Sequence, residues 1–159
     1  MPRAITPNLW FDTQAEEAAQ YYCSIFPDSR IVNVTHYTEA APKKAGEVLT
    51  VDFELKGQRF TAINGGPEFT FDEAVSQQIR CEDQAEIDYY WEKLTDGGSE
   101  GPCGWCKDRY GLSWQVTPNG VDQLFAGEPE GAARAVQAMF GMHKLDIAAL
   151  EAARDGVPA

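Results

Sequence analysis

Two short stretches decide the fold of this chain: Ile5-Thr6-Pro7-Asn8-Leu9-Trp10-Phe11 and, one residue later, Thr13-Gln14-Ala15-Glu16. Outward- and inward-facing residues alternate in the first stretch, which predicts a half-buried strand. In the second, Glu16 follows Thr13 at the spacing of a capping box, which predicts that a helix begins there. The helix start recurs 70 positions later as Asp83-Gln84-Ala85-Glu86, again after a predicted strand. A strand–helix unit that occurs twice predicts a duplicated architecture.

The rest of the chain completes an α+β pattern. The first half adds a helix to about Phe26 and strands at 30–38, 48–55 and 60–64; the second half adds a strand at 75–81, a helix at 83–95 and a strand at 112–117. Turn residues fill 99–110 where two more strands would stand, so the second half is predicted to be abbreviated. Apolar stripes at 131–141 and 146–155 predict helices that pack against the sheet or a second subunit. We therefore expect a single domain, 1–159, made of a first module (3–67), a second module (74–119) and a helical tail (120–157).

Charge and composition exclude several classes of function. The 159 residues carry a net charge of −12, which argues against nucleic acid and against an anionic membrane surface. Neither a run long enough to span a bilayer nor the apolar stretch of a secretory signal is present in the sequence. A cytoplasmic protein is expected.

The motifs Ala62-Ile63-Asn64-Gly65-Gly66-Pro67, Cys103-Gly104-Trp105 and Lys107-Asp108-Arg109-Tyr110-Gly111-Leu112-Ser113-Trp114-Gln115 carry a family resemblance, together with the first strand. With them the chain resembles the vicinal oxygen chelate superfamily of glyoxalases, bleomycin-resistance proteins and extradiol dioxygenases. Within it, the chain is similar to the PhnB-like subgroup, which often carries the name 3-demethylubiquinone-9 3-methyltransferase. The resemblance implies paired βαβββ modules that form a half-barrel cup of mixed sheet with helices outside, and a homodimer.

The same resemblance implies where a ligand would bind. The polar faces of the strands would line the cup, and the candidate ligand-binding residues are Thr6, Asn8, Trp10, Asn64, Ser76, Gln78, Arg80, Trp105 and Gln115. Metal-dependent members use His and Glu at positions that here fall on Thr6, Ser76, Gln115 and either Thr61 or Asn64. None of these is an imidazole or a carboxylate, and His36 and His143 lie elsewhere, so we expect no metal and no cofactor.

Other chemical signals have structural explanations. Cys103 and Cys106 form a C-x-x-C, but in a Gly/Pro loop without a helix start, which favours two reduced loop cysteines. Asp108 is expected to accept backbone hydrogen bonds in a turn, and Arg109 to make a surface ion pair. A strand-borne Arg80 that faces a cup needs an anion, either Asp52 or Glu54 or a ligand carboxylate or phosphate.

Three functions fit these observations. The first is a small-molecule-binding protein with a metal-free cup and an unknown ligand, and this is the prediction. The alternative is an enzyme of the same superfamily that acts on an unidentified small metabolite: a lyase, a dioxygenase or the methyltransferase that the subgroup's name describes. Methyl transfer has little support, because Gly65-Gly66-Pro67 does not open a helix in a doubly wound sheet. A dimer whose cup is plugged by side chains such as Trp10 is the third.

Overall fold

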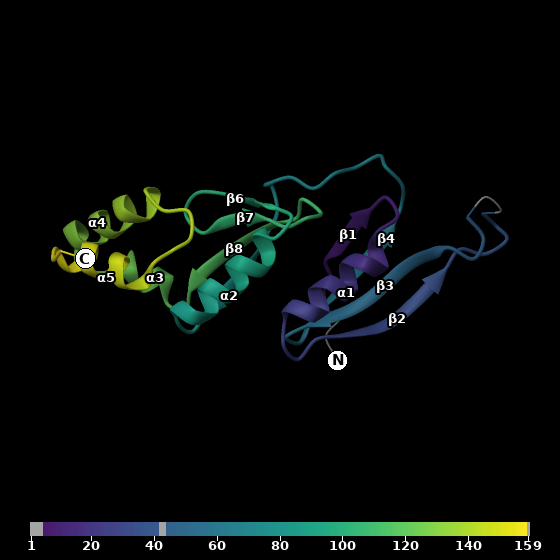
Figure 1. Cartoon of the computed structure of the whole chain (residues 1–159), viewed down its shortest axis with the longest axis horizontal. Coiled ribbons are helices and arrows are strands. Elements are labelled where there is room, and N and C mark those ends of the chain that lie inside the picture. Colours follow the sequence, from purple (N-terminus) through teal and green to yellow (C-terminus); the bar gives the residue numbers. More distant parts are fainter. Residues whose placement is uncertain (1–4, 42–43, 159) are drawn as a thin grey trace. The chain divides into compact units, whose positions relative to one another are not determined.

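The computed structural model describes residues 5–41 and 44–158, so the first two residues of the predicted module 3–67 lie outside it. It divides into two compact units, residues 1–70 and 71–159, whose boundary falls between the two predicted modules. Each unit contains one four-stranded mixed sheet (Figure 1). The expected α+β class with paired βαβββ modules is confirmed.

In the first unit, β1 (Asn8–Phe11) leads into α1 (Ala15–Ile25), followed by β2 (Arg30–His36), β3 (Val48–Leu55) and β4 (Gln58–Asn64). The sheet order is β1-β4-β3-β2, with β1 parallel to β4 and the other pairs antiparallel. Small residues on α1, such as Ala18 and Ala19, let the helix approach the sheet closely, and Tyr22 stacks on Phe53 of β3 at 6.1 Å between ring centroids. The core of this unit therefore lies between α1 and one face of the sheet.

Two local predictions for this unit are wrong. Ile5, which is expected to begin the half-buried strand, is 93% exposed and precedes β1. Strand pairing begins only at Pro7, whose carbonyl accepts the Thr61 N–H. Thr13 does not cap α1. The N-cap position is Gln14 without a side-chain cap, and the Ala15 N–H is instead accepted by Asn64 Oδ1 at 2.8 Å. A side chain distant in sequence thus replaces the expected capping box.

The second unit repeats the order. It contains β5 (Ser76–Cys81), α2 (Gln84–Thr95), β6 (Ser99–Glu100), β7 (Trp105–Lys107) and β8 (Ser113–Pro118), in the sheet order β5-β8-β7-β6. As predicted, Asp83 caps α2 by accepting the Glu86 N–H. Residues 99–110 do form two strands, which corrects the prediction of a module lacking them. The two strands have only two and three residues, and the Gly101 N–H continues their pairing into the turn by donating to the Trp105 carbonyl at 2.8 Å.

The tail forms α3 (Val121–Leu124), α4 (Pro129–Phe140) and α5 (Ile147–Asp155). Leu124, Leu145 and Leu150 make a small core of their own, so these helices pack chiefly on one another rather than on the sheet. Gln84 of α2 ties the tail to the unit, since its amide bonds the Leu145 carbonyl and the Ile147 N–H at 3.1 and 2.9 Å. Among the described residues, no helix has the length and apolar character to cross a membrane.

Candidate functional site

Strand register shows how the two modules correspond. In the first sheet Asn8 of β1 stands opposite Thr61 of β4, and in the second Gln78 of β5 stands opposite Gln115 of β8. Because Asn8 and Gln78 are partners in the sequence repeat, Thr61 is the counterpart of Gln115. The structure thus decides the choice between Thr61 and Asn64 that the sequence left open.

Asn64 itself lies on the other side of the sheet. It is buried on the same face as Phe60 and Ala62, where it caps α1 and donates from Nδ2 to the Val48 carbonyl at 3.1 Å. Its predicted orientation toward a ligand is therefore corrected, since both ends of its amide are engaged in the helix-facing core.

The polar face of the second sheet brings together most of the residues predicted in that module. Gln115 donates from Nε2 to Ser76 Oγ at 2.8 Å, and Gln78 donates to Thr117 Oγ1 at 3.2 Å. Trp105 of β7 stands opposite Gln115 in the ladder and so extends the same face. The result is a row of hydroxyls and amides that ends on an indole ring.

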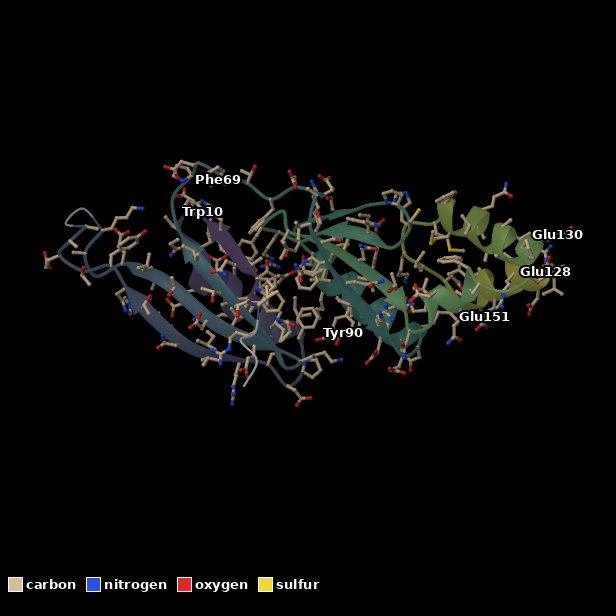
Figure 2. All side chains as sticks on the ribbon, turned by 180° about the vertical axis from the view of Figure 1, so that it is seen from behind. Trp10, Phe69, Tyr90, Glu128, Glu130 and Glu151 are labelled. Atoms are coloured by element: carbon tan, nitrogen blue, oxygen red, sulfur yellow. The ribbon has the colours of Figure 1, made fainter. Side chains whose placement is uncertain are left out.

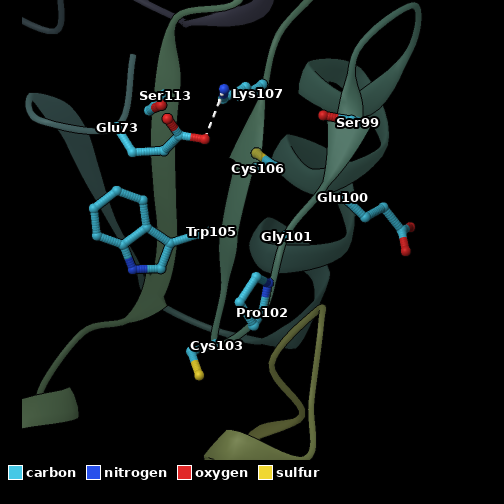
Figure 3. A pocket seen from close by; sticks show the side chains of 10 residues that line it. All are labelled: Glu73, Ser99, Glu100, Gly101, Pro102, Cys103, Trp105, Cys106, Lys107 and Ser113. Atoms are coloured by element: carbon cyan, nitrogen blue, oxygen red, sulfur yellow. Dashed lines mark ion pairs between the residues drawn. The ribbon is translucent and has the colours of Figure 1, made fainter.

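A cavity of about 450 Å³ lies next to this row, within the second unit (Figure 3). Trp105, Lys107 and Ser113 reach it from the strands, Pro102 and Cys103 from the β6–β7 turn, and Glu73 from the connector before β5. Lys107 Nζ makes an ion pair with Glu73 Oε1 at 2.7 Å. That hydrogen bond and charge lower the pKa of the Glu73 carboxyl. Sequence reasoning missed both residues, although alternation from Trp105 puts Lys107 on the same face.

Arg80 has a different partner from the two predicted acids. It makes an ion pair at 3.5 Å with Asp122 of α3, and both side chains are largely exposed. In the first unit Glu54 lies between Arg30 and Arg59, at 2.9 and 3.1 Å. The contact between Arg80 and Asp122 is long and exposed, which makes it a weak pair.

The first sheet places Asn8 and Trp10 on its polar face and Thr6 just before the strand. Trp10 donates from Nε1 to the Gly66 carbonyl at 2.8 Å and meets Phe69 edge-on at 5.1 Å. Figure 2 shows Trp10 and Phe69 near each other. Asn8 donates from Nδ2 to the Thr6 carbonyl at 2.9 Å. Trp10 is thus held in place by its own unit.

The residues at the superfamily's ligand positions do not fit a divalent metal ion. Thr61 donates its hydroxyl to Asp52 at 2.6 Å, and Gln115 donates from Nε2 to Ser76 Oγ at 2.8 Å. Neutral hydroxyl and amide oxygens do not balance the charge of a desolvated divalent ion. Within the part of the chain that the structure describes, no group of three or more His, Cys, Asp or Glu could hold a metal.

The cysteine pair of the second unit is divided between two environments. Cys106 is buried on the helix-facing side of β7, and burial, with the Asp108 and Glu100 carboxylates nearby, raises the pKa of its thiol to about 12. Cys103 lies in the turn at φ 59° and lines the cavity. Both are free thiols. A thiol with such a raised pKa is a poor nucleophile near neutral pH, which disfavours redox chemistry at this pair.

The charged cluster that follows β7 has a structural role, as predicted. Asp108 accepts hydrogen bonds from the backbone N–H groups of Tyr110 and Leu112 and from Trp114 Nε1. Arg109 forms a surface ion pair with Asp96 at 3.0 Å. The turn therefore fixes the start of β8 rather than offering a reactive group.

Comparisons with known proteins identify the family. The family model of 3-demethylubiquinone-9 3-methyltransferase matches residues 3–117. A putative 3-demethylubiquinone-9 3-methyltransferase, the PhnB protein from Bacillus cereus, is 38% identical, with a TM-score of 0.65 over 73% of this chain and 99% of that one. The comparison with curated proteins gives no match.

Two more distant structures share the fold alone. A protein from Pseudomonas aeruginosa is 19% identical, with a TM-score of 0.62 over 74% of this chain and 98% of that one. The fosfomycin resistance protein FosX from Listeria monocytogenes, in complex with Mn(II) and 1S,2S-dihydroxypropylphosphonic acid, is 11% identical, with a TM-score of 0.54 over 79% of this chain and 99% of that one. The matched family model and the Bacillus cereus relative show that this chain belongs to the PhnB-like 3-demethylubiquinone-9 3-methyltransferase family of the vicinal oxygen chelate superfamily.

Proposed function

We propose that this protein binds a small organic molecule on the polar face of its second module, without a metal ion. The observation that carries the proposal is the cavity beside Trp105, whose volume of about 450 Å³ lies in the range of small-ligand sites. An indole and a proline ring supply flat apolar surface, and the neighbouring Ser76 and Gln115 supply directional hydrogen bonds. Such a site recognises a molecule through apolar contact and directional hydrogen bonds.

The fold supports a binding role independently of the family's name. FosX, which shares the fold, forms a complex with Mn(II) and a small phosphonic acid, so the fold can hold a small molecule. The name of the family describes methyl transfer, yet each sheet here is a small mixed one in which a single strand pair is parallel. S-adenosylmethionine sites after the first strand of a doubly wound parallel sheet therefore have no counterpart in either module. Binding, rather than methyl transfer, is the activity we propose.

Within the second module, Arg80 on the same face of β5 would offer a cation to an acidic ligand. Thr6, Asn8 and Trp10 are proposed as ligand contacts of the first module, as the resemblance implies. We also propose that the protein acts as a cytoplasmic homodimer, the assembly that the family resemblance implies.

Titration with 2-naphthoate and 2-naphthamide, followed by tryptophan fluorescence and calorimetry, tests the proposed function. Trp105→Ala should abolish binding of both compounds, because it removes the largest apolar surface of the cavity. Tyr89→Ala is the matched control, since Tyr89 is an exposed aromatic residue of α2 outside the cavity, and it should bind like the wild type. Failure of both compounds to bind the wild type, or equal binding by Trp105→Ala and the wild type, would contradict the proposal.

A further inference from the structure

One ion pair stands at the wall of the cavity, and its two members are held differently. Among the described residues that line the cavity, Lys107 is the only cation. It projects from β7, which pairs with β6 on one side and β8 on the other, and its side chain is 35% exposed. Its partner Glu73 belongs to the connector before β5 and is 63% exposed. The cation is therefore fixed by the sheet, whereas the carboxylate reaches in from a segment outside it.

Glu100, the second acidic residue that lines the cavity, does not face Lys107. Glu100 of β6 stands opposite Cys106 in the ladder, so it lies on the helix-facing side of the sheet. There its Oε1 accepts the indole N–H of Trp91 of α2 at 2.9 Å. Figure 3 shows the Glu100 side chain pointing away from Lys107 and Trp105. On the polar face, then, Glu73 is the one carboxylate of the lining that faces Lys107.

An exposed ion pair contributes little stability, because both charges remain well solvated and screened. Exchange of Glu73 for another carboxylate at Lys107 therefore costs little. An incoming carboxylate would gain the same charge-assisted hydrogen bond, and its attached apolar body would gain contact with Trp105 and Pro102, which Glu73 does not offer. The site favours a molecule that combines both parts.

We propose that the ligand of this cavity is an organic anion with a flat apolar body, whose carboxylate replaces Glu73 at Lys107 Nζ while the body lies against Trp105. The inference rests on the proposed function and adds the class of ligand to it. Glu73 then acts as an internal competitor that occupies the cation when no ligand is bound. A cationic ligand would instead pair with Glu73 and displace Lys107. That arrangement is disfavoured because it would leave the lysine, which is fixed by the sheet, without an anionic partner.

The experiment compares 2-naphthoate with its neutral isostere 2-naphthamide by calorimetry at low and high NaCl. The wild type should prefer the carboxylate by about tenfold, the size expected of one charge-assisted hydrogen bond, and salt should weaken only that preference. Lys107→Gln should lower naphthoate affinity by about tenfold and leave naphthamide affinity unchanged. Glu73→Gln should raise naphthoate affinity severalfold, because it removes the competitor.

Lys144→Gln is the matched control. Lys144 also makes an exposed ion pair, with Asp88 at 2.5 Å, but lies outside the cavity lining, so its loss should change neither affinity. Equal binding of naphthoate and naphthamide by the wild type, or unchanged naphthoate affinity in Glu73→Gln, would overturn the assignment of an anion while leaving the binding site intact. Failure of both compounds to bind would instead overturn the proposed function itself.

Discussion

Replacement of Asp108 by asparagine changes one atom of the carboxylate and should destabilise the second unit strongly. Asp108 is only 2% exposed, and its two carboxylate oxygens accept hydrogen bonds from different donors. Oδ1 accepts the Tyr110 and Leu112 N–H groups at 2.8 and 3.2 Å, and Oδ2 accepts Trp114 Nε1 at 2.8 Å. An asparagine whose oxygen serves the backbone must turn its NH₂ group toward the indole N–H, so two donors face each other.

The magnitude follows from what that replacement removes. The substitution removes the charge-assisted hydrogen bond to Trp114 and leaves the buried indole N–H without an acceptor. Together these losses lower the free energy of unfolding by about 2–4 kcal/mol. The flipped amide is no better, because it would present its NH₂ to the two backbone donors of Tyr110 and Leu112. For a chain of this size, about 3 kcal/mol corresponds to a fall in Tm of roughly 6–12 °C.

Urea denaturation followed by circular dichroism measures this cost. Asp96→Asn is the control, because Asp96 is 76% exposed in its pair with Arg109, and its loss should cost less than about 1 kcal/mol. In a Trp114→Phe background the indole donor is gone, so Asp108→Asn should cost about 2 kcal/mol less than in the wild type. An identical cost in both backgrounds, or a wild-type-like Asp108→Asn protein, would refute the reasoning.

Three further predictions concern single side chains. Asn64→Ala should cost about 1–2 kcal/mol in urea denaturation, because α1 loses the acceptor for its first N–H; a neutral effect would contradict the capping role. Gly65→Ala should cost about 1–3 kcal/mol and alter near-ultraviolet dichroism, since the added methyl would stand 2.1 Å from the Trp10 ring. Ellman's reagent at pH 8 should label Cys103 well before Cys106. Early labelling of Cys106 would contradict its burial. Because the pKa of folded Cys106 is raised to about 12, the thiol of the unfolded chain ionises at a lower pH, and the free energy of unfolding should fall as the pH rises from about 9 toward 12.

The fold could be predicted from the sequence because its signals are local and repeated. Alternation and helix-start patterns identify the strand–helix order of both modules, and the 70-residue repeat relates them. The errors arise where tertiary contacts replace local ones. Thr13 has the spacing of a cap, yet Asn64 supplies the acceptor from β4, and no pattern within the helix start reveals that partner.

The candidate site could be predicted only in part. Ser76, Gln78 and Gln115 lie together as expected, because strand alternation assigns each to one face. The same alternation from Phe60 places Asn64 on the helix-facing side of β4. The pairing of Lys107 with Glu73 cannot be predicted from a pattern, since it joins a strand to an irregular connector whose path has no period in the sequence.

The C-terminal extension also shapes the site, although the family model ends at residue 117. The turn between β6 and β7 has two successive residues in the left-handed region, Cys103 at φ 59° and Gly104 at φ 80°. Their N–H groups donate to the carbonyls of Met142 and His143 at 2.8 and 2.7 Å. Without these acceptors the turn would lose two backbone partners immediately before Trp105. The position of the indole that shapes the cavity therefore depends on residues outside the region that defines the family.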